Sequence, residues 1–315
     1  MTRLYPAILL LSILILVASA AFQPGETAPQ TSEDLGRLLF EDPILSSDQS
    51  ISCASCHIPA FAFSDTSTVS LGVGGQKGTR NTPAITNMSA RSAFFWDGRA
   101  GTLEQQVIQP IENPVEMNLP IPIAIERLRN SARYNGFFKA IYGRPADTIT
   151  LADALATFIR TLETGNTAFD RWMQGNDTAM SASAIRGRAV FMTKGKCFDC
   201  HFSPDFTGDE FRNIGLFDGK KLNDPGRFAI TKDSADLGKF KVPGLRNIAV
   251  TAPYMHDGSF RTLREVIDYY DQPDKFVTHS FNRDPLLAKP LNLTEQEKQD
   301  IEAFLLALTD KSFEF

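Results

Sequence analysis

Apolar residues recur at helical spacing in several long stretches of the chain. The segments 121–143 (IPIAIERLRNSARYNGFFKAIYG) and 150–165 (TLADALATFIRTLETG) repeat apolar positions every three or four residues, which predicts helices. The segments 183–201 and 295–308 show helical patterns too, and the first of them leads directly into a pair of cysteines. No segment has a strong hairpin pattern. The sequence therefore predicts an all-α protein.

Residues at the ends of these segments indicate where helices start and stop. Thr150, ahead of Asp153, is expected to open one helix, and Gly165 is expected to close it. Thr294 and Glu297 have the spacing of a capping box, in which each side chain bonds the other residue's backbone N–H. A helix is therefore expected to begin after Thr294.

The N-terminus has the pattern of a secretory signal peptide. Arg3 precedes an apolar run from Leu4 to Val17, and small residues follow at positions 18–20. We expect residues 1–20 to be removed and the mature chain to begin at about Ala21, in the periplasm of a bacterium. An uncleaved membrane anchor is the alternative, because the apolar run nearly reaches the length that spans a bilayer.

Composition limits the class of protein. At 315 residues the chain is long enough for two domains, and its 43% hydrophobic and 22% charged residues are typical of globular proteins. The formal net charge is −5. A mildly acidic surface argues against a nucleic acid partner.

All four cysteines lie in two Cys-x-x-Cys-His motifs, formed by Cys53, Cys56 and His57 and by Cys197, Cys200 and His201. Disulfide, zinc or thiol-redox sites are the alternatives for such pairs in an exported protein. The histidine directly after each pair favours c-type haem, in which two thiols bind the porphyrin and the histidine ligates its iron. The sequence therefore predicts two haem c groups.

The distance between the motifs along the chain indicates one haem per domain. We expect two cytochrome c-like domains, at 21–174 and 184–315, joined by the polar linker 175–183 (GNDTAMSAS).

Four stretches resemble the bacterial di-haem cytochrome c peroxidase and MauG family. They are 81–87 (NTPAITN), 94–118 (FFWDGRAGTLEQQVIQPIENPVEMN), 158–172 (FIRTLETGNTAFDRW) and 241–263 (KVPGLRNIAVTAPYMHDGSFRTL). The resemblance implies that the N-terminal haem reacts with hydrogen peroxide and that the C-terminal haem exchanges electrons. It also implies a calcium ion between the domains.

The resemblance assigns roles to single residues. Glu116 is expected to move a proton between the peroxide oxygens, with Gln106 and Pro110 shaping the pocket around it. Trp96 matches the tryptophan that lies between the two haems and relays electrons. The implied calcium site uses oxygen ligands from three positions, namely Asn81, Thr251 and Pro253.

Two positions depart from the pattern of ordinary peroxidases. Val73 stands where members that need reductive activation carry a histidine that caps the first iron, so the first haem is expected to lack a protein ligand on its distal face. Tyr270 stands where electron-accepting members carry a methionine and MauG-type proteins a tyrosine. A phenolate ligand lowers the haem potential. Met255 or Tyr269 as the ligand, or a packing role for Tyr270, are the alternatives.

The remaining histidines have simpler interpretations. His256 is expected to form hydrogen bonds near the second haem without ligating its iron, and His279 is expected in a surface loop.

Three functions follow from these residues. The favoured one is a peroxidase that takes electrons from a small periplasmic protein, a cytochrome c or a cupredoxin. The second is a MauG-like oxidase of a protein substrate, against which the segment 192–201 (MTKGKCFDCH) lacks a tryptophan expected from resemblance to MauG. The third is a di-haem electron carrier, which has no use for Glu116 on an open haem face. A homodimer is plausible from the resemblance.

Overall fold

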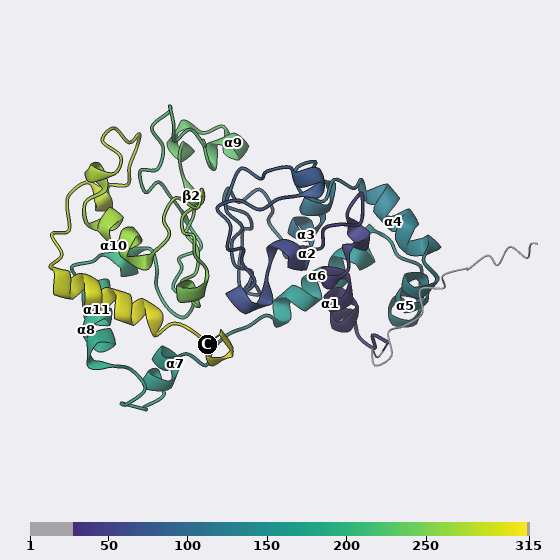
Figure 1. Cartoon of the computed structure of the whole chain (residues 1–315), viewed down its shortest axis with the longest axis horizontal. Coiled ribbons are helices and arrows are strands. Elements are labelled where there is room, and N and C mark those ends of the chain that lie inside the picture. The colour runs from purple at the N-terminus through teal and green to yellow at the C-terminus, as the bar shows by residue number, and fades with distance from the viewer. Residues whose placement is uncertain (1–27, 314–315) are drawn as a thin grey trace, which may run out of the picture.

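The computed structural model describes residues 28–313 of the chain. The predicted signal peptide, residues 1–20, lies outside the described residues. Two helical lobes lie side by side, the N-terminal one coloured purple to teal and the C-terminal one teal to yellow (Figure 1). Among the described residues, no helix is both long and apolar enough to cross a membrane.

Helices form the framework of both lobes. The N-terminal lobe contains α1 (Ser32–Glu41), α2 (Cys53–Cys56), α3 (Leu103–Glu112), α4 (Ile121–Asn130), α5 (Ala132–Tyr142) and α6 (Thr148–Thr161). The C-terminal lobe contains α7 (Ala168–Met173), α8 (Ala182–Met192), α9 (Phe228–Thr231), α10 (Leu263–Asp271) and α11 (Glu295–Leu306). Within residues 28–313, the sheet is a single antiparallel pair of short strands, β1 (Phe211–Arg212) and β2 (Phe240–Lys241). The predicted all-α class is confirmed.

Three helix boundaries differ from the prediction. Helix α6 ends at Thr161, with Leu162 and not Gly165 as its C-terminal cap, and the other two boundaries differ because side chains nearby offer better caps. The segment 121–143 is two helices, since Ser131 ends α4 and its hydroxyl accepts a hydrogen bond from the N–H of Tyr134 to start α5. Asp147, not Thr150, caps α6, and its carboxylate accepts from the Thr150 N–H at 2.8 Å. The capping box of Thr294 and Glu297 at the start of α11 is confirmed.

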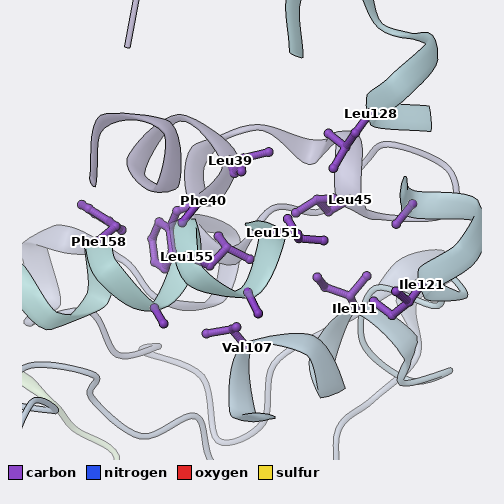
Figure 2. Close-up of a cluster of buried hydrophobic side chains, with 14 of the residues drawn as sticks. Leu39, Phe40, Leu45, Val107, Ile111, Ile121, Leu128, Leu151, Leu155 and Phe158 are labelled. Atoms are coloured by element: carbon purple, nitrogen blue, oxygen red, sulfur yellow. The ribbon is translucent and has the colours of Figure 1, made fainter. Parts of the chain in front are cut away.

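The N-terminal core lies between α1 and α6 and extends to α3 and α4. Figure 2 shows Leu39 and Phe40 of α1 facing Leu151, Leu155 and Phe158 of α6. Gly36 allows this close crossing, because a Cβ there would lie 1.9 Å from the backbone oxygen of Ala154.

The C-terminal core repeats this arrangement with α8 and α11. Gly187 of α8 faces the backbone of α11, and a Cβ there would lie 1.7 Å from the oxygen of Asp300. Buried residues belong to the first core up to the end of α6 and to the second from Phe169 onward. Phe169 precedes the predicted linker 175–183, so α7 packs with the C-terminal lobe.

The two lobes follow the same plan beyond these helix pairs. Residues 81–110 correspond position by position to residues 241–270, an offset of 160. Phe95 and Met255 both adopt left-handed backbone conformations, with φ of 65° and 72°. Matching antiparallel bridges enclose these turns, Phe94 with Ala100 and Tyr254 with Phe260. The same loop and helix therefore follow each Cys-x-x-Cys-His motif.

Equivalent residues meet at the contact between the lobes. The N–H of Asn81 donates to the oxygen of His256 at 2.8 Å, and the N–H of Lys241 donates to the oxygen of Trp96 at 2.8 Å. Asn81 corresponds to Lys241, and Trp96 corresponds to His256. The two hydrogen bonds are therefore reciprocal and set how the repeats face each other.

Replacing Gly187 with alanine tests the close crossing of α8 and α11. Because the new methyl group would collide with backbone, the two helices must separate, and we expect a loss of about 1–3 kcal/mol in the free energy of unfolding. Urea unfolding followed by circular dichroism measures this change.

Gly136 provides the matched control, since it lies inside α5 and a methyl group added there would meet nothing within 4 Å. Gly136→Ala should be neutral or stabilise the protein by up to about 1 kcal/mol. Equal stability of the Gly187→Ala protein and wild type would contradict the crossing described.

Candidate functional site

The first Cys-x-x-Cys-His motif forms a short helix followed by an anchored imidazole. Cys53 and Cys56 begin and end α2, and His57 follows as its C-terminal cap. The ring Nδ1 of His57 lies 2.9 Å from the oxygen of Phe63. A carbonyl oxygen only accepts hydrogen bonds, so Nδ1 carries the proton and Nε2 keeps a free lone pair for a metal.

The second motif forms a 3-10 turn, Cys197–Asp199, and its histidine is anchored in the same way. Nδ1 of His201 lies 2.9 Å from the oxygen of Phe206. Burial lowers the pKa of both His57 and His201, which favours the neutral imidazole that ligates iron. Both motifs therefore present a neutral ring with its tautomer fixed.

A cavity of about 1020 Å³ connects the two motifs through the contact between the lobes. It is lined by all six motif residues and is mostly apolar. Such a volume lies at the upper end of the roughly 300–1,000 Å³ usual for ligand pockets, and the cavity reaches both motifs, which suits large planar groups. The cavity thus fits the two haem groups that the motifs predict.

The four cysteines are free thiols. None of the cysteines forms a disulfide. Burial raises the pKa of Cys53 and Cys197 to about 12 and that of Cys200 to about 11, which disfavours the thiolates a zinc site needs. Within residues 28–313, no cluster of three or more His, Cys, Asp or Glu side chains could hold a metal ion. Thiols of this kind fit covalent attachment to porphyrin vinyl groups.

Glu116, Gln106 and Pro110 line the cavity together, beside the first motif. Gln106 and Pro110 lie one helical turn apart on α3, and Glu116 lies in the loop that follows the helix. Burial raises the pKa of Glu116, while the Nδ2 of Asn113, which donates to its Oε1 at 2.5 Å, acts in the opposite direction. A half-buried carboxyl of this kind can both accept and return a proton.

The loop that carries Val73 lies against Glu116. The N–H of Val73 donates to the backbone oxygen of Glu116 at 2.8 Å. Leu71 and Gly72 of the same loop line the cavity. Neither residue offers a side chain that can ligate iron, so the open first haem stays a prediction that this loop supports.

Trp96 lies where the two lobes meet and lines the cavity. Its indole Nε1 donates to the oxygen of Asn81 at 2.8 Å, and its own oxygen accepts from Lys241 of the other lobe. The indole hydrogen bond orients the ring, and the backbone hydrogen bond joins Trp96 to the C-terminal lobe.

The three residues proposed for calcium also line this cavity. The Nδ2 of Asn81 bonds the oxygens of Ser67 and Thr68, which leaves its Oδ1 as an available ligand. Within the described chain, the carbonyls of Thr251 and Pro253 accept no backbone hydrogen bond. These hard oxygen atoms suit calcium, and the assignment remains a prediction.

The structure distinguishes the two adjacent tyrosines of α10. Tyr269 is fully buried, and its hydroxyl donates to the oxygen of Ile214 at 2.6 Å. Tyr270 lines the cavity beside the second motif, and its hydroxyl makes no hydrogen bond within the described residues. Burial raises the pKa of Tyr270, so its phenolate requires a neighbouring cation such as ferric iron.

The repeat gives Tyr270 a counterpart. It corresponds to Pro110 of α3, which lines the cavity on the first motif's side. A proline side chain has no donor atom for iron, whereas a tyrosine has one. Met255, the other candidate ligand, lines the cavity too.

The two remaining histidines differ in burial. His256 is buried and stacks on Phe240, with ring centroids 3.7 Å apart. Burial lowers its pKa. His279 lies exposed in a loop, as expected.

Comparisons with known proteins agree with this geometry. A family model described as di-haem cytochrome c peroxidase matches residues 30–178. The methylamine utilization protein MauG of Methylorubrum extorquens is 40% identical over 277 residues, covering 87% of this chain and 77% of that protein. This chain belongs to the di-haem cytochrome c peroxidase/MauG family.

Other family members are similar over most of the chain. The cytochrome c551 peroxidase of Nitrosomonas europaea is 34% identical, covering 96% of this chain and 87% of that protein. A solved structure of a MauG-like protein associated with microbial copper homeostasis has a TM-score of 0.82 and 34% identity, covering 91% and 92% of the two chains. The chain is therefore an oxidoreductase of this type, and its two motifs imply two haem c groups.

Sequence reasoning missed the charged residues that join the lobes. Arg80 bonds Asp224, and Arg91 bonds Asp205. The repeat was also missed, although a shared Asp-Gly and Thr-Leu at matching positions, 97–98 with 257–258 and 102–103 with 262–263, signal it. Alignment of the chain with itself could have found the repeat, but not the ion pairs.

Replacing Tyr270 with methionine tests its assignment as a haem ligand. A thioether favours the ferrous state more than a phenolate does, so the potential of the second haem should rise clearly. Redox titration followed by visible spectra measures both haem potentials.

Tyr269→Phe is the matched control. It removes the hydroxyl that bonds Ile214, so it should reduce stability by about 1 kcal/mol without moving the potential. An unchanged second potential in Tyr270→Met would exclude Tyr270 and favour Met255.

Proposed function

We propose that the protein is a periplasmic peroxidase that reduces hydrogen peroxide at the first motif and receives electrons through the second. The observation that carries this proposal is Glu116, a half-buried carboxyl with a raised pKa that opens onto the cavity beside the first motif. An electron carrier needs no proton-transfer group at this position. Family membership supplies the reaction class.

The reaction defines what the residues must do. Hydrogen peroxide takes up two electrons and two protons, its O–O bond breaks, and two waters form. When bound, haem supplies an iron that exchanges electrons with the peroxide oxygens. Glu116 takes the proton from one oxygen and returns it to the departing oxygen, so that water leaves instead of hydroxide.

Neighbouring residues prepare Glu116 for this role. Asn113 holds one carboxylate oxygen, and the Val73 N–H holds the backbone of the same residue. Gln106 offers an amide to the pocket, and Pro110, whose side chain has no donor atom, would leave a bound iron without a protein ligand from this position. The carboxyl is thereby fixed in place before peroxide enters.

The second motif and the residues between the lobes serve electron delivery. The donor class is a small one-electron redox protein, a c-type cytochrome or a cupredoxin. Trp96 lies between the two motifs, and its indole can give up and regain one electron. Tyr270 would ligate the second iron, and calcium would bind at Asn81, Thr251 and Pro253 and steady the contact between the lobes.

A MauG-like oxidase of a protein substrate is the second candidate, because the chain is 40% identical to a protein named MauG. Tyr270 fits it as well. Against it, the segment 192–201 has no tryptophan before the second motif. Gly195 within it is tightly enclosed, since a Cβ there would lie 3.0 Å from the oxygen of Val190. The peroxidase is therefore favoured.

Replacing Glu116 with glutamine should leave both haem groups in place but reduce peroxide turnover by roughly 100- to 10,000-fold, because proton transfer to the departing oxygen is lost. In wild type, turnover should fall as the pH drops through the pKa of Glu116, which burial raises above that of an ordinary glutamate. Steady-state turnover measured against pH tests both statements.

Two further variants sharpen this test. Asn113→Ala removes a hydrogen bond that favours the ionised carboxylate, so the acidic limb should move to higher pH. Glu112→Gln alters an exposed carboxylate at the end of α3 and should leave turnover unchanged. Near-normal turnover in Glu116→Gln would remove Glu116 from the mechanism.

A further inference from the structure

Arg80 joins the two lobes next to Trp96. Its Nε and Nη2 donate to the two carboxylate oxygens of Asp224 at 2.7 and 2.9 Å, and its Nη1 donates to Asp97 at 2.6 Å. Arg80 and Asp97 belong to the N-terminal lobe, whereas Asp224 belongs to the C-terminal lobe. One guanidinium therefore binds a carboxylate on each side of the contact, and the paired geometry to Asp224 makes that bond directional.

These residues are direct neighbours of the electron relay. Arg80 precedes Asn81, whose oxygen accepts the indole N–H of Trp96, and Asp97 follows Trp96. The segments 80–81 and 96–97 are thus connected twice, by an ion pair and by the indole hydrogen bond. A shift of Arg80 would move both partners of that hydrogen bond.

Asp224 comes from a part of the chain that the N-terminal lobe lacks. The repeat runs from Phe63 to Pro83 in the first lobe but from Phe206 to Pro243 in the second, where residues 207–239 form a longer connection that we call the bridging segment. Figure 1 shows its α9 on the side of the C-terminal lobe that faces the other lobe. Asp209 of this segment accepts from the N–H and hydroxyl of Ser92, both at 2.7 Å.

The three charged side chains of Arg80, Asp97 and Asp224, which we call the clasp, are largely shielded from solvent. The side chains of Asp97, Arg80 and Asp224 are 6%, 18% and 24% exposed. The guanidinium also lies 5.5 Å from the ring centre of Phe240, which stacks on His256. Asp97 has a second cation in Arg99, whereas the hydrogen bonds that Asp224 accepts within the described residues come from Arg80 and the N–H of Gly226. Without Arg80, the carboxylate of Asp224 would be hydrated by solvent, and the two lobes would separate around Trp96.

We propose that Arg80 is a positioning residue for electron transfer between the two haem sites, which it supports by clasping Asp224 and Asp97 around Trp96. The proposal rests on the proposed function, in which electrons pass between the sites through the indole. A ring that is held in one orientation transfers an electron with little rearrangement of its surroundings. Asn223, Asp224 and Pro225 of the bridging segment line the cavity on which Trp96 lies.

Arg80→Gln in the purified two-haem protein tests the proposal. The half-reduced protein is mixed with one equivalent of peroxide, and stopped-flow spectra follow the oxidation of the second haem. Because a displacement of about 1 Å can slow a reaction roughly 100-fold, we expect this oxidation to slow by at least about tenfold. Arg80→Lys keeps the charge but loses the paired bonds, and should fall between wild type and Arg80→Gln.

Hydrogen–deuterium exchange provides a readout that does not depend on turnover. The amides of Asn81 and Lys241 donate across the contact between the lobes, so Arg80→Gln should speed their exchange. Thermal unfolding is measured alongside to account for general loss of stability.

Arg91→Gln is the matched control. Arg91 also pairs across the lobes, with Asp205, and its side chain is 8% exposed, but it does not neighbour Trp96 in the chain. This variant should lower the melting temperature without slowing the oxidation of the second haem. It should also leave the hydrogen exchange of the Asn81 and Lys241 amides unchanged. An equal slowing in Arg91→Gln would show a general effect of lobe stability and overturn the proposal.

The outcomes separate the two proposals. If peroxide oxidises the second haem equally fast in wild type and Arg80→Gln, the role of Arg80 is wrong and the proposed function stands. If peroxide fails to oxidise the second haem in wild type, the proposed function is wrong, and the role of Arg80 falls with it.

Discussion

Two reciprocal backbone hydrogen bonds hold the lobes in register, from Asn81 to His256 and from Lys241 to Trp96. They join equivalent positions of a repeated loop, so they turn the same face of each lobe toward the other. The shared cavity depends on this contact. It makes the two motif cavities continuous and places Trp96 between them. A rotation of one lobe would break both bonds together.

Repetition of one scaffold with a few different side chains gives each motif its own chemistry. Both imidazoles are anchored in the same way, through Nδ1 to a carbonyl of a following phenylalanine. The opposite sides of the cavities differ, because α3 presents Pro110 where α10 presents Tyr270. Glu116 lies beside the first motif. The two motifs therefore have different surroundings, which is the basis of the different roles proposed for them.

Charged side chains carry much of the contact between the lobes. Buried ion pairs are specific rather than strongly stabilising, because desolvation of the charges offsets most of their attraction. The pairs of Arg80 with Asp224 and Arg91 with Asp205 therefore determine where the lobes meet more than how tightly they bind. The apolar cores within the lobes, such as that between α1 and α6, provide the stability on which this precision rests.

The sequence by itself determined the features that depend on short spacing. Two Cys-x-x-Cys-His motifs, the helical periods and the capping box at Thr294 each involve residues within a few positions, whose geometry the local backbone sets. Even this local prediction was wrong in one place. Asp147, three residues before Thr150, is the N-terminal cap of α6, because its carboxylate is the better acceptor for a backbone N–H. Tertiary structure alone decided that Tyr269 bonds Ile214 while Tyr270 faces the cavity, and that Arg80 meets Asp224. These partners lie far apart in the chain, and only the packing of two folded lobes brings them together.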